Sequence, residues 1–192
     1  MLTLALLLFQ EKDPATTKEA MQRVQLVVGP WRCTVVNKES KEESWVEKQE
    51  WNFKIEKDEF RLEVKITDGK YLKGGVLGYD LKKKVYRFEA ARADGRKSGF
   101  EGKLKDRELL LEEIVEKGTA QDRMTFHLLR DNRFLVSVER RAAGKETYLL
   151  LYAYGCTKEG VPFVKGEPPK CVVTGGTGTM PVSYEGKTYY VC

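Results

Sequence analysis

Four cysteines and a single histidine are the residues of this 192-residue chain whose chemistry is most specific. Two of the cysteines, Cys171 and Cys192, bracket a turn-rich C-terminal stretch. Thiolates suit zinc and copper, but a structural zinc site normally has four ligands. This pair supplies two and has no histidine nearby. Three alternatives stay open: further ligands in a continuation of the chain past Cys192, a disulfide, or a metal shared between chains.

The segment that ends at Cys192 resembles a known metal-binding module. Residues 182–192 read Val-Ser-Tyr-Glu-Gly-Lys-Thr-Tyr-Tyr-Val-Cys, an alternating strand pattern that follows a glycine-rich loop. This pattern is similar to the start of YHS/TRASH-type domains, whose cysteines hold a metal. The resemblance implies that Cys171 and Cys192 are metal ligands and that zinc or copper is the bound ion. Thr174 stands where the family often has a second early cysteine, which leaves the ligand set incomplete.

Most of the chain before this segment alternates apolar and polar residues with the period of a β-strand. Turn-forming pairs such as Asp68-Gly69, Asp94-Gly95 and Asp131-Asn132 separate the runs, as in hairpins. The prediction is a mainly β fold: an antiparallel up-and-down β-barrel of about nine or ten strands, with a short N-terminal helix and a small C-terminal β-hairpin. The apolar positions of the runs are Trp51, Phe53, Ile55; Phe60, Leu62, Val64, Ile66; Tyr86, Phe88, Ala90; Met124, Phe126, Leu128; Phe134, Val136, Val138; and Leu150, Tyr152, Tyr154.

A helix is predicted over residues 17–28, where apolar residues follow helical spacing between a cap at Thr16 or Thr17 and a stop at Gly29-Pro30. The residue after that stop is Trp31. A short helix leading into Gly-Pro-Trp resembles the Gly-x-Trp opening of lipocalin-like (calycin) barrels. The resemblance implies that Trp31 plugs one end of the barrel beneath the helix. The alternative is a tryptophan that fills a core in any fold.

The other two cysteines lie at the two ends of the predicted barrel. Cys33 is in the first predicted strand and Cys156 is at the end of the last one. In a closed meander these two strands are antiparallel neighbours, which can bring the cysteines within the roughly 4.4–6.8 Å between Cα atoms that a disulfide requires. A disulfide in that position would clamp the barrel seam. The alternative is two separately buried thiols.

His127 lies in a strand-like run and shares a face with Thr125 and Leu129. It is interpreted as a surface histidine or one satisfied by hydrogen bonds; the alternative is an axial haem ligand inside the barrel, as in some haem-binding calycins. The sequence has no Gly-x-Ser-x-Gly, no His-Glu-x-x-His and no phosphate-binding loop between a strand and a helix. Its carboxylates form no obvious acid–base pair. We therefore expect no catalytic residues and no enzymatic activity.

The two ends of the chain differ in composition from the barrel region. Leu2–Phe9 form an apolar run that is too short to span a bilayer as a helix but fits the core of a secretory signal peptide. Residues 1–14 are therefore predicted to be a signal peptide, or an apolar arm packed on the domain, and a signal peptide implies export to the periplasm or the extracellular space. The barrel is predicted over 15–158, a linker rich in proline and glycine over 159–170, and the YHS/TRASH-like segment over 171–192.

The charge pattern argues against a nucleic-acid partner. The 34 Lys and Arg against 29 Asp and Glu give a net charge of +5, but the two signs alternate along the sequence. A nucleic-acid surface needs a concentrated basic stripe instead. No segment is long and apolar enough to predict a membrane-spanning helix.

We therefore predict a soluble, exported, non-enzymatic binding protein that handles a metal ion or carries a small apolar ligand in its barrel. The alternative is a structural or interaction protein with a filled barrel and a disulfide-stapled tail. Periodicity does not distinguish a filled barrel from a hollow one. Several glycines either open space inside the barrel or mark bulges. They are Gly74, Gly75, Gly78, Gly99 and Gly102.

Overall fold

The chain divides into two compact units, residues 1–161 and residues 162–192, and each is described by itself. The first unit holds the barrel and its helix, and the second holds a two-stranded hairpin. The computed structural model describes residues 13–40, 44–57, 59–160, 180–184 and 187–191.

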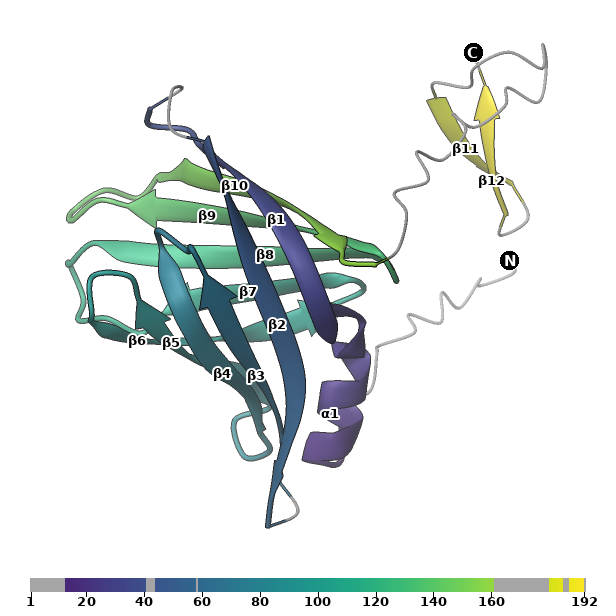
Figure 1. Cartoon of the computed structure of the whole chain (residues 1–192), viewed down its shortest axis with the longest axis horizontal. Coiled ribbons are helices and arrows are strands. Elements are labelled where there is room, and N and C mark those ends of the chain that lie inside the picture. Colours follow the sequence, from purple (N-terminus) through teal and green to yellow (C-terminus); the bar gives the residue numbers. More distant parts are fainter. Residues whose placement is uncertain (1–12, 41–43, 58, 161–179, 185–186, 192) are drawn as a thin grey trace, which may run out of the picture. The chain divides into compact units, whose positions relative to one another are not determined.

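Ten antiparallel strands form a closed barrel in the first unit, and consecutive strands pair with each other (Figure 1). The first strand, β1, pairs with the last, β10, and so closes the barrel. The predicted fold class, an up-and-down antiparallel barrel with a short N-terminal helix, is confirmed. The strands are β1 (Gly29–Asn37), β2 (Ser44–Glu56), β3 (Glu59–Thr67), β4 (Leu72–Asp80), β5 (Val85–Arg92), β6 (Lys97–Lys105), β7 (Glu108–Glu113), β8 (Gln121–Arg130), β9 (Arg133–Arg141) and β10 (Tyr148–Lys158).

Alternating burial along the strands follows the predicted apolar faces, with two departures. Phe53 and Ile55 are 43 % and 60 % exposed, because residues 52–56 of β2 pair with β3 in a hairpin that extends beyond the end of β1. In β10 a bulge shifts the register, so that Leu151 is buried and the predicted inward residue Leu150 is exposed. Alternation therefore locates the strands correctly but not where a hairpin leaves the barrel or where a bulge reverses its faces.

A short helical segment packs on one end of the barrel (Figure 1). It consists of α1 (Thr17–Arg23) and a 3-10 turn (Gln25–Val27), and α1 contacts β3 and β4. Thr16 caps α1 by accepting a hydrogen bond from the amide of Glu19, as a threonine N-cap does. Within the described ranges, no helix is long and apolar enough to cross a membrane. Because α1 packs against β3 and β4, the helical segment covers this end of the barrel, which is called the covered end below.

Trp31 lies at this covered end, in the first strand. Its side chain is fully buried, and its indole Nε1 donates a hydrogen bond to the carbonyl oxygen of Val27 at 2.6 Å. The ring meets that of Phe134 edge-on, with centroids 4.6 Å apart. Trp31 therefore packs beneath the helical segment, as the resemblance implies, and the ten-stranded barrel fits a lipocalin-like fold.

The second unit contains the predicted C-terminal hairpin. Its strands are β11 (Met180–Tyr184) and β12 (Lys187–Val191). They pair antiparallel, with Met180 opposite Val191. The alternating pattern in this part of the sequence therefore does form strands.

Candidate functional site

The two barrel cysteines form a disulfide across the seam. Cys33 of β1 lies directly opposite Cys156 of β10 in the strand register, and their sulfurs are bonded. Both side chains are fully buried among core residues. The bridge predicted for these two residues is present, and it joins positions 123 residues apart in sequence. It therefore fastens the first strand of the barrel to the last.

The other predicted site residues do not come together with it. Cys171 and Cys192 lie outside the described residues, so their pairing and the predicted zinc or copper site stay predictions. His127 lies on the outer face of β8, where its Nδ1 is 3.3 Å from a carboxylate oxygen of Glu108. It points away from the interior, so it is the surface histidine of the sequence interpretation and cannot ligate a haem inside the barrel. Among the described residues, no group of three or more His, Cys, Asp or Glu is placed to hold a metal ion.

The barrel interior is filled by side chains. Two interior cavities measure about 10 Å³ and about 20 Å³, whereas pockets for small ligands are on the order of 300–1,000 Å³. The glycines that face inward leave no extra room. A Cβ added to Gly75 would lie 2.6 Å from the ring of Phe88, and one added to Gly102 would lie 1.7 Å from the carbonyl oxygen of Leu110. The larger cavity has room for about one water molecule.

A row of polar side chains runs through this interior along β2. The indole of Trp45 and the amide of Gln49 donate hydrogen bonds to the two carboxylate oxygens of Glu47, at 3.0 and 2.8 Å. Gln49 in turn accepts a hydrogen bond from the indole of Trp51 at 3.0 Å. Burial raises the pKa of Glu47, against the opposing effect of these hydrogen bonds. The row satisfies its own polar atoms, which fits a structural role.

A network of charges, mostly buried apart from Arg140, lies at the barrel end opposite α1. The guanidinium of Arg92, which is 5 % exposed, contacts Asp122 at 2.9 Å and Glu113 at 2.7 Å. Arg140 contacts the same Asp122 carboxylate at 2.7 Å, and the hydroxyl of Tyr71 donates to it at 2.8 Å. These side chains come from β5, β7, β8, β9 and the segment before β4, so the network ties five parts of the barrel together.

Electrostatics keep this network ionised. Burial by itself raises the pKa of Asp122, but the hydrogen bonds from Arg140, Tyr71 and Arg92 outweigh burial and hold that pKa below its ordinary value. Burial raises the pKa of Tyr71, which therefore stays a phenol and a hydrogen-bond donor. Paired charges therefore occupy the barrel end opposite α1.

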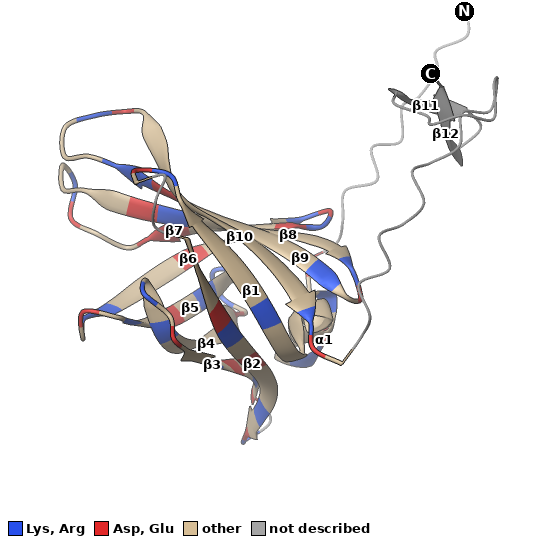
Figure 2. Cartoon of the chain, turned by 45° about the horizontal axis from the view of Figure 1, so that its top comes forward, with Lys and Arg blue, Asp and Glu red and all other residues tan. Residues whose placement is uncertain are grey.

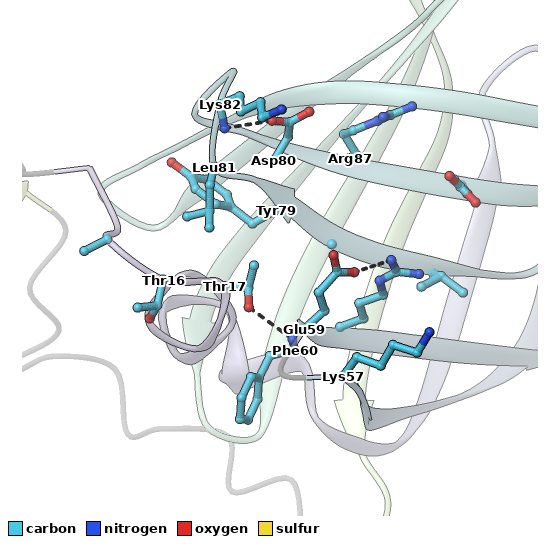
Figure 3. Close-up of a pocket in the computed structure, with 15 residues that line it drawn as sticks. Thr16, Thr17, Lys57, Glu59, Phe60, Tyr79, Asp80, Leu81, Lys82 and Arg87 are labelled. Carbon is cyan, nitrogen blue, oxygen red and sulfur yellow. Dashed lines mark hydrogen bonds and ion pairs between the residues drawn. The ribbon is translucent and has the colours of Figure 1, made fainter.

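Outside the barrel, a groove of about 630 Å³ lies between the start of α1, the β2–β3 hairpin and the β4–β5 hairpin (Figure 3). Charges of both signs are interspersed over the barrel (Figure 2), and the groove shares this mixture. Its cationic side chains are Lys57, Arg61, Lys82 and Arg87. Its carboxylates are Glu59, Asp80 and Glu89.

The groove exists because β3 and β4 separate toward the helix. Their pairing starts at Lys65 and Gly74 and stops at Leu62 and Leu77, three residues short of the end of each strand. At the separated edge, the amide of Phe60 donates to the hydroxyl of Thr17 at 3.1 Å (Figure 3). On the facing strand Gly78 has no side chain, and a Cβ added there would meet only Arg61, at 3.8 Å. The result is a hollow with strand edges on both sides.

A second hollow, of about 810 Å³, lies over β6, β7 and β8 and includes His127 and Glu108. Here β6 and β7 pair along the whole length of β7, from Glu108 to Glu113. The main-chain groups under this hollow are therefore engaged in the sheet. The groove at β3 and β4 differs because the pairing of these two strands has ended there, so it offers a ligand main-chain groups as well as side chains.

Sequence reasoning identified the disulfide but neither the charge network nor the groove. Arg92 continues the inward phase of Tyr86, Phe88 and Ala90, and this spacing is the signal that places a charge inside the barrel. Gly78 is one of the glycines expected to open space inside the barrel or to mark a bulge, and it lies instead on the outward face of β4, in the lining of the groove. The alternation of the sequence does not locate the separation of β3 from β4, because β3 alternates up to its end and the pattern of β4 is already irregular, with three glycines and a bulge.

Comparisons with known proteins give a distant structural likeness. No protein-family model matches the chain, and no curated protein matches it. Among solved structures, the crystal structure of Rv2717c from M. tuberculosis matches over 73 % of this chain and 97 % of that chain, with 14 % sequence identity and a TM-score of 0.46. The fit of the barrel to a lipocalin-like fold rests on the strand order and the position of Trp31.

Proposed function

We propose that this chain is an exported, non-enzymatic binding protein that uses a filled barrel as a rigid scaffold and binds its ligand in the outer groove at β3 and β4. The observation that carries this proposal is one of volume. The interior cavities measure about 10 and 20 Å³, whereas the two outer hollows measure about 630 and 810 Å³. Of these two, the groove of about 630 Å³ is the one where strand pairing has ended. A ligand-sized space is therefore found outside the barrel.

The contacts inside the barrel support a scaffold role. Glu47 and Asp122, the buried carboxyl groups, are held by hydrogen bonds from neighbouring side chains. The seam disulfide and the charge network add constraints at opposite parts of the structure. A ligand in the interior would have to break these contacts or displace core aromatic rings.

Export is supported by the buried disulfide between Cys33 and Cys156, because disulfides persist mainly in oxidising compartments. The apolar run Leu2–Phe9 lies outside the described residues, and its role as a signal peptide remains a prediction. Metal handling by Cys171 and Cys192 likewise stays a prediction from the resemblance of the tail to YHS/TRASH-type domains.

The second candidate is a structural or interaction protein that has the same filled barrel and a disulfide-stapled tail and binds no ligand in the groove. The filled interior favours both candidates over a carrier of apolar molecules. They differ in whether the groove binds a ligand.

A fragment screen by NMR distinguishes them. The full chain, labelled with ¹⁵N, is titrated with a library of small polar fragments, and amide shifts are mapped onto the structure. We expect shifts that cluster on Arg61, Gly78 and neighbouring groove residues. Shifts confined to interior-facing residues such as Phe88 would contradict the proposal, and so would a library that produces no clustered shifts.

A further inference from the structure

We propose that the groove binds an extended, acidic peptide segment of a partner protein, which adds as a short strand to the free edge of β4. This inference rests on the proposed function and names the class of partner for the same groove. Strand addition is a common mode of peptide recognition, in which main-chain hydrogen bonds supply affinity and side-chain pockets supply specificity.

The first argument is the unpaired edge of β4. The carbonyl oxygen of Asp80 accepts a hydrogen bond from the amide of Lys84, within the β4–β5 hairpin. Neighbouring residues of a strand direct their main-chain groups to opposite sides, so those of Tyr79 face away from β5 and toward β3. The β3–β4 pairing has already ended at Leu77. Tyr79 therefore presents its main-chain N–H and C=O to the groove.

The facing strand does not supply the missing partner. Had the pairing continued, Phe60 of β3 would stand opposite Tyr79. The amide of Phe60 instead donates to the side chain of Thr17. The unpaired length covers three residues of β4, residues 78–80, which is about 10 Å at the usual strand rise. A segment of three or four extended residues fits this length.

The second argument is the room above the edge. Gly78 lies between Val76 and Asp80, whose side chains share its outward face in the alternation of β4. Because Gly78 has no side chain and a Cβ there would have only Arg61 nearby, at 3.8 Å, the backbone can be approached closely at this point. Figure 3 shows Asp80, Arg87, Glu59 and Lys57 around the hollow. An incoming peptide backbone can therefore reach the edge of β4.

The third argument is charge. Asp80 accepts hydrogen bonds from the amides of Lys82 and Lys83, which hold its pKa below its ordinary value, and Glu59 is paired with Arg61. Lys57 and Lys82 form no ion pair with any described residue, and two carboxylates of the groove, Asp80 and Glu89, form none either. Over the whole lining, the groove has four cationic side chains against three carboxylates, which is an excess of one positive charge. Acidic side chains on the peptide complement it.

Three peptides test the proposal on the full, oxidised chain. The probe is an acetylated and amidated hexapeptide that alternates aspartate and valine. The second peptide has lysine in place of aspartate, and the third is the aspartate peptide with N-methyl groups on alternate amides, which removes strand hydrogen bonds. Binding is measured by NMR titration of the ¹⁵N-labelled protein. We expect the aspartate peptide to shift the amides of Gly78 and Tyr79, and each of the other peptides to bind at least tenfold more weakly.

A matched pair of variants locates the binding. Gly78→Leu fills the groove, and Gly155→Leu places the same side chain on β10, where a Cβ would meet only Arg133, at 3.9 Å. We expect at least tenfold weaker binding of the aspartate peptide to G78L and unchanged binding to G155L, with both variants retaining the wild-type spectrum elsewhere. Absence of binding to the wild-type protein, or equal affinity for G78L, would overturn the proposal. If the fragment screen still maps to the groove in that case, the proposed function stands and only the peptide is wrong.

Discussion

At the scale of single residues, the barrel is held by polar groups that lie inside it. Asp122 accepts hydrogen bonds from three side chains, and Arg92 sits between two carboxylates with almost no exposure. Burying a charge costs free energy unless it is paired and hydrogen-bonded, and here each charge is. Substitutions that leave a buried partner charge unpaired should therefore destabilise the barrel the most.

Asp122→Ala is expected to lower the free energy of unfolding by about 3–5 kcal/mol, because it leaves the buried Arg92 without one of its two carboxylates. Chemical denaturation at neutral pH measures the effect. Glu59→Ala is the control, since the pair between Glu59 and Arg61 is exposed and should be worth less than about 1 kcal/mol. Equal losses in the two variants would show that the network is not a stabilising feature.

Glu47 gives stability a pH dependence of defined sign. Its pKa in the folded protein is raised, mainly by burial, above the ordinary value of 4.5. Between the pKa of Glu47 in the unfolded chain and its raised pKa in the folded protein, the folded protein keeps a proton that the unfolded chain releases. The stability that Glu47 contributes is therefore greatest below this pH range and falls as the pH rises through it. The pKa of Asp122 is shifted downward, so protonation of Asp122 changes the stability only at lower pH. Urea unfolding at a series of pH values above 4.5 measures this fall in the free energy of unfolding, and Glu47→Gln should remove it. If the free energy falls equally in the variant, another group causes the fall.

The disulfide between Cys33 and Cys156 closes a long loop. By the chain-entropy estimate, a bridge across 123 residues contributes about 5 kcal/mol, less any strain. The double variant Cys33→Ala/Cys156→Ala should lose roughly that amount in urea unfolding without reductant. A loss under about 1 kcal/mol would mean that strand pairing alone holds the seam.

At the scale of elements, the sequence predicts what depends on local alternation and misses what depends on neighbours. The strands, the helix and the place of Trp31 follow from period and from a short resemblance, and the structure contains them. The exposed Phe53 and Ile55 fit the same alternation, but only the register shows that their hairpin has no partner in β1. The groove arises in the same way, because the ends of β3 and β4 look like ordinary strand.

Trp31 tests how the elements pack together, because its side chain contacts both the helical segment and Phe134 of β9. Trp31→Phe removes the hydrogen bond to the Val27 carbonyl and part of a fully buried ring, so we expect a loss of about 2–4 kcal/mol in the free energy of unfolding. The exposed Ile55→Ala should change it by less than about 0.5 kcal/mol. Thermal or urea unfolding compares the two. A mild effect at Trp31 would argue that the helical segment is not fastened through this residue.

At the scale of the whole molecule, side chains fill the interior of the barrel, and the ligand-sized hollows lie on its outside. The interior aromatic rings, the polar row on β2 and the charge network occupy the space that a carrier would leave empty. Composition and periodicity do not predict this, because a hollow barrel and a filled one alternate alike. The small interior cavities therefore support our proposal of binding at the groove more than the predicted apolar cargo inside the barrel, which stays a prediction.

Titration with cis-parinaric acid, a fluorescent fatty acid, tests this central claim most directly. Energy transfer from the buried Trp31 and Trp51 would report entry of the probe into the barrel. With interior cavities of about 10 and 20 Å³, we predict no saturable binding at micromolar concentrations of the full chain. One-to-one binding with submicromolar affinity, retained in Gly78→Leu, would contradict the account, because it would place a ligand inside the barrel rather than in the groove.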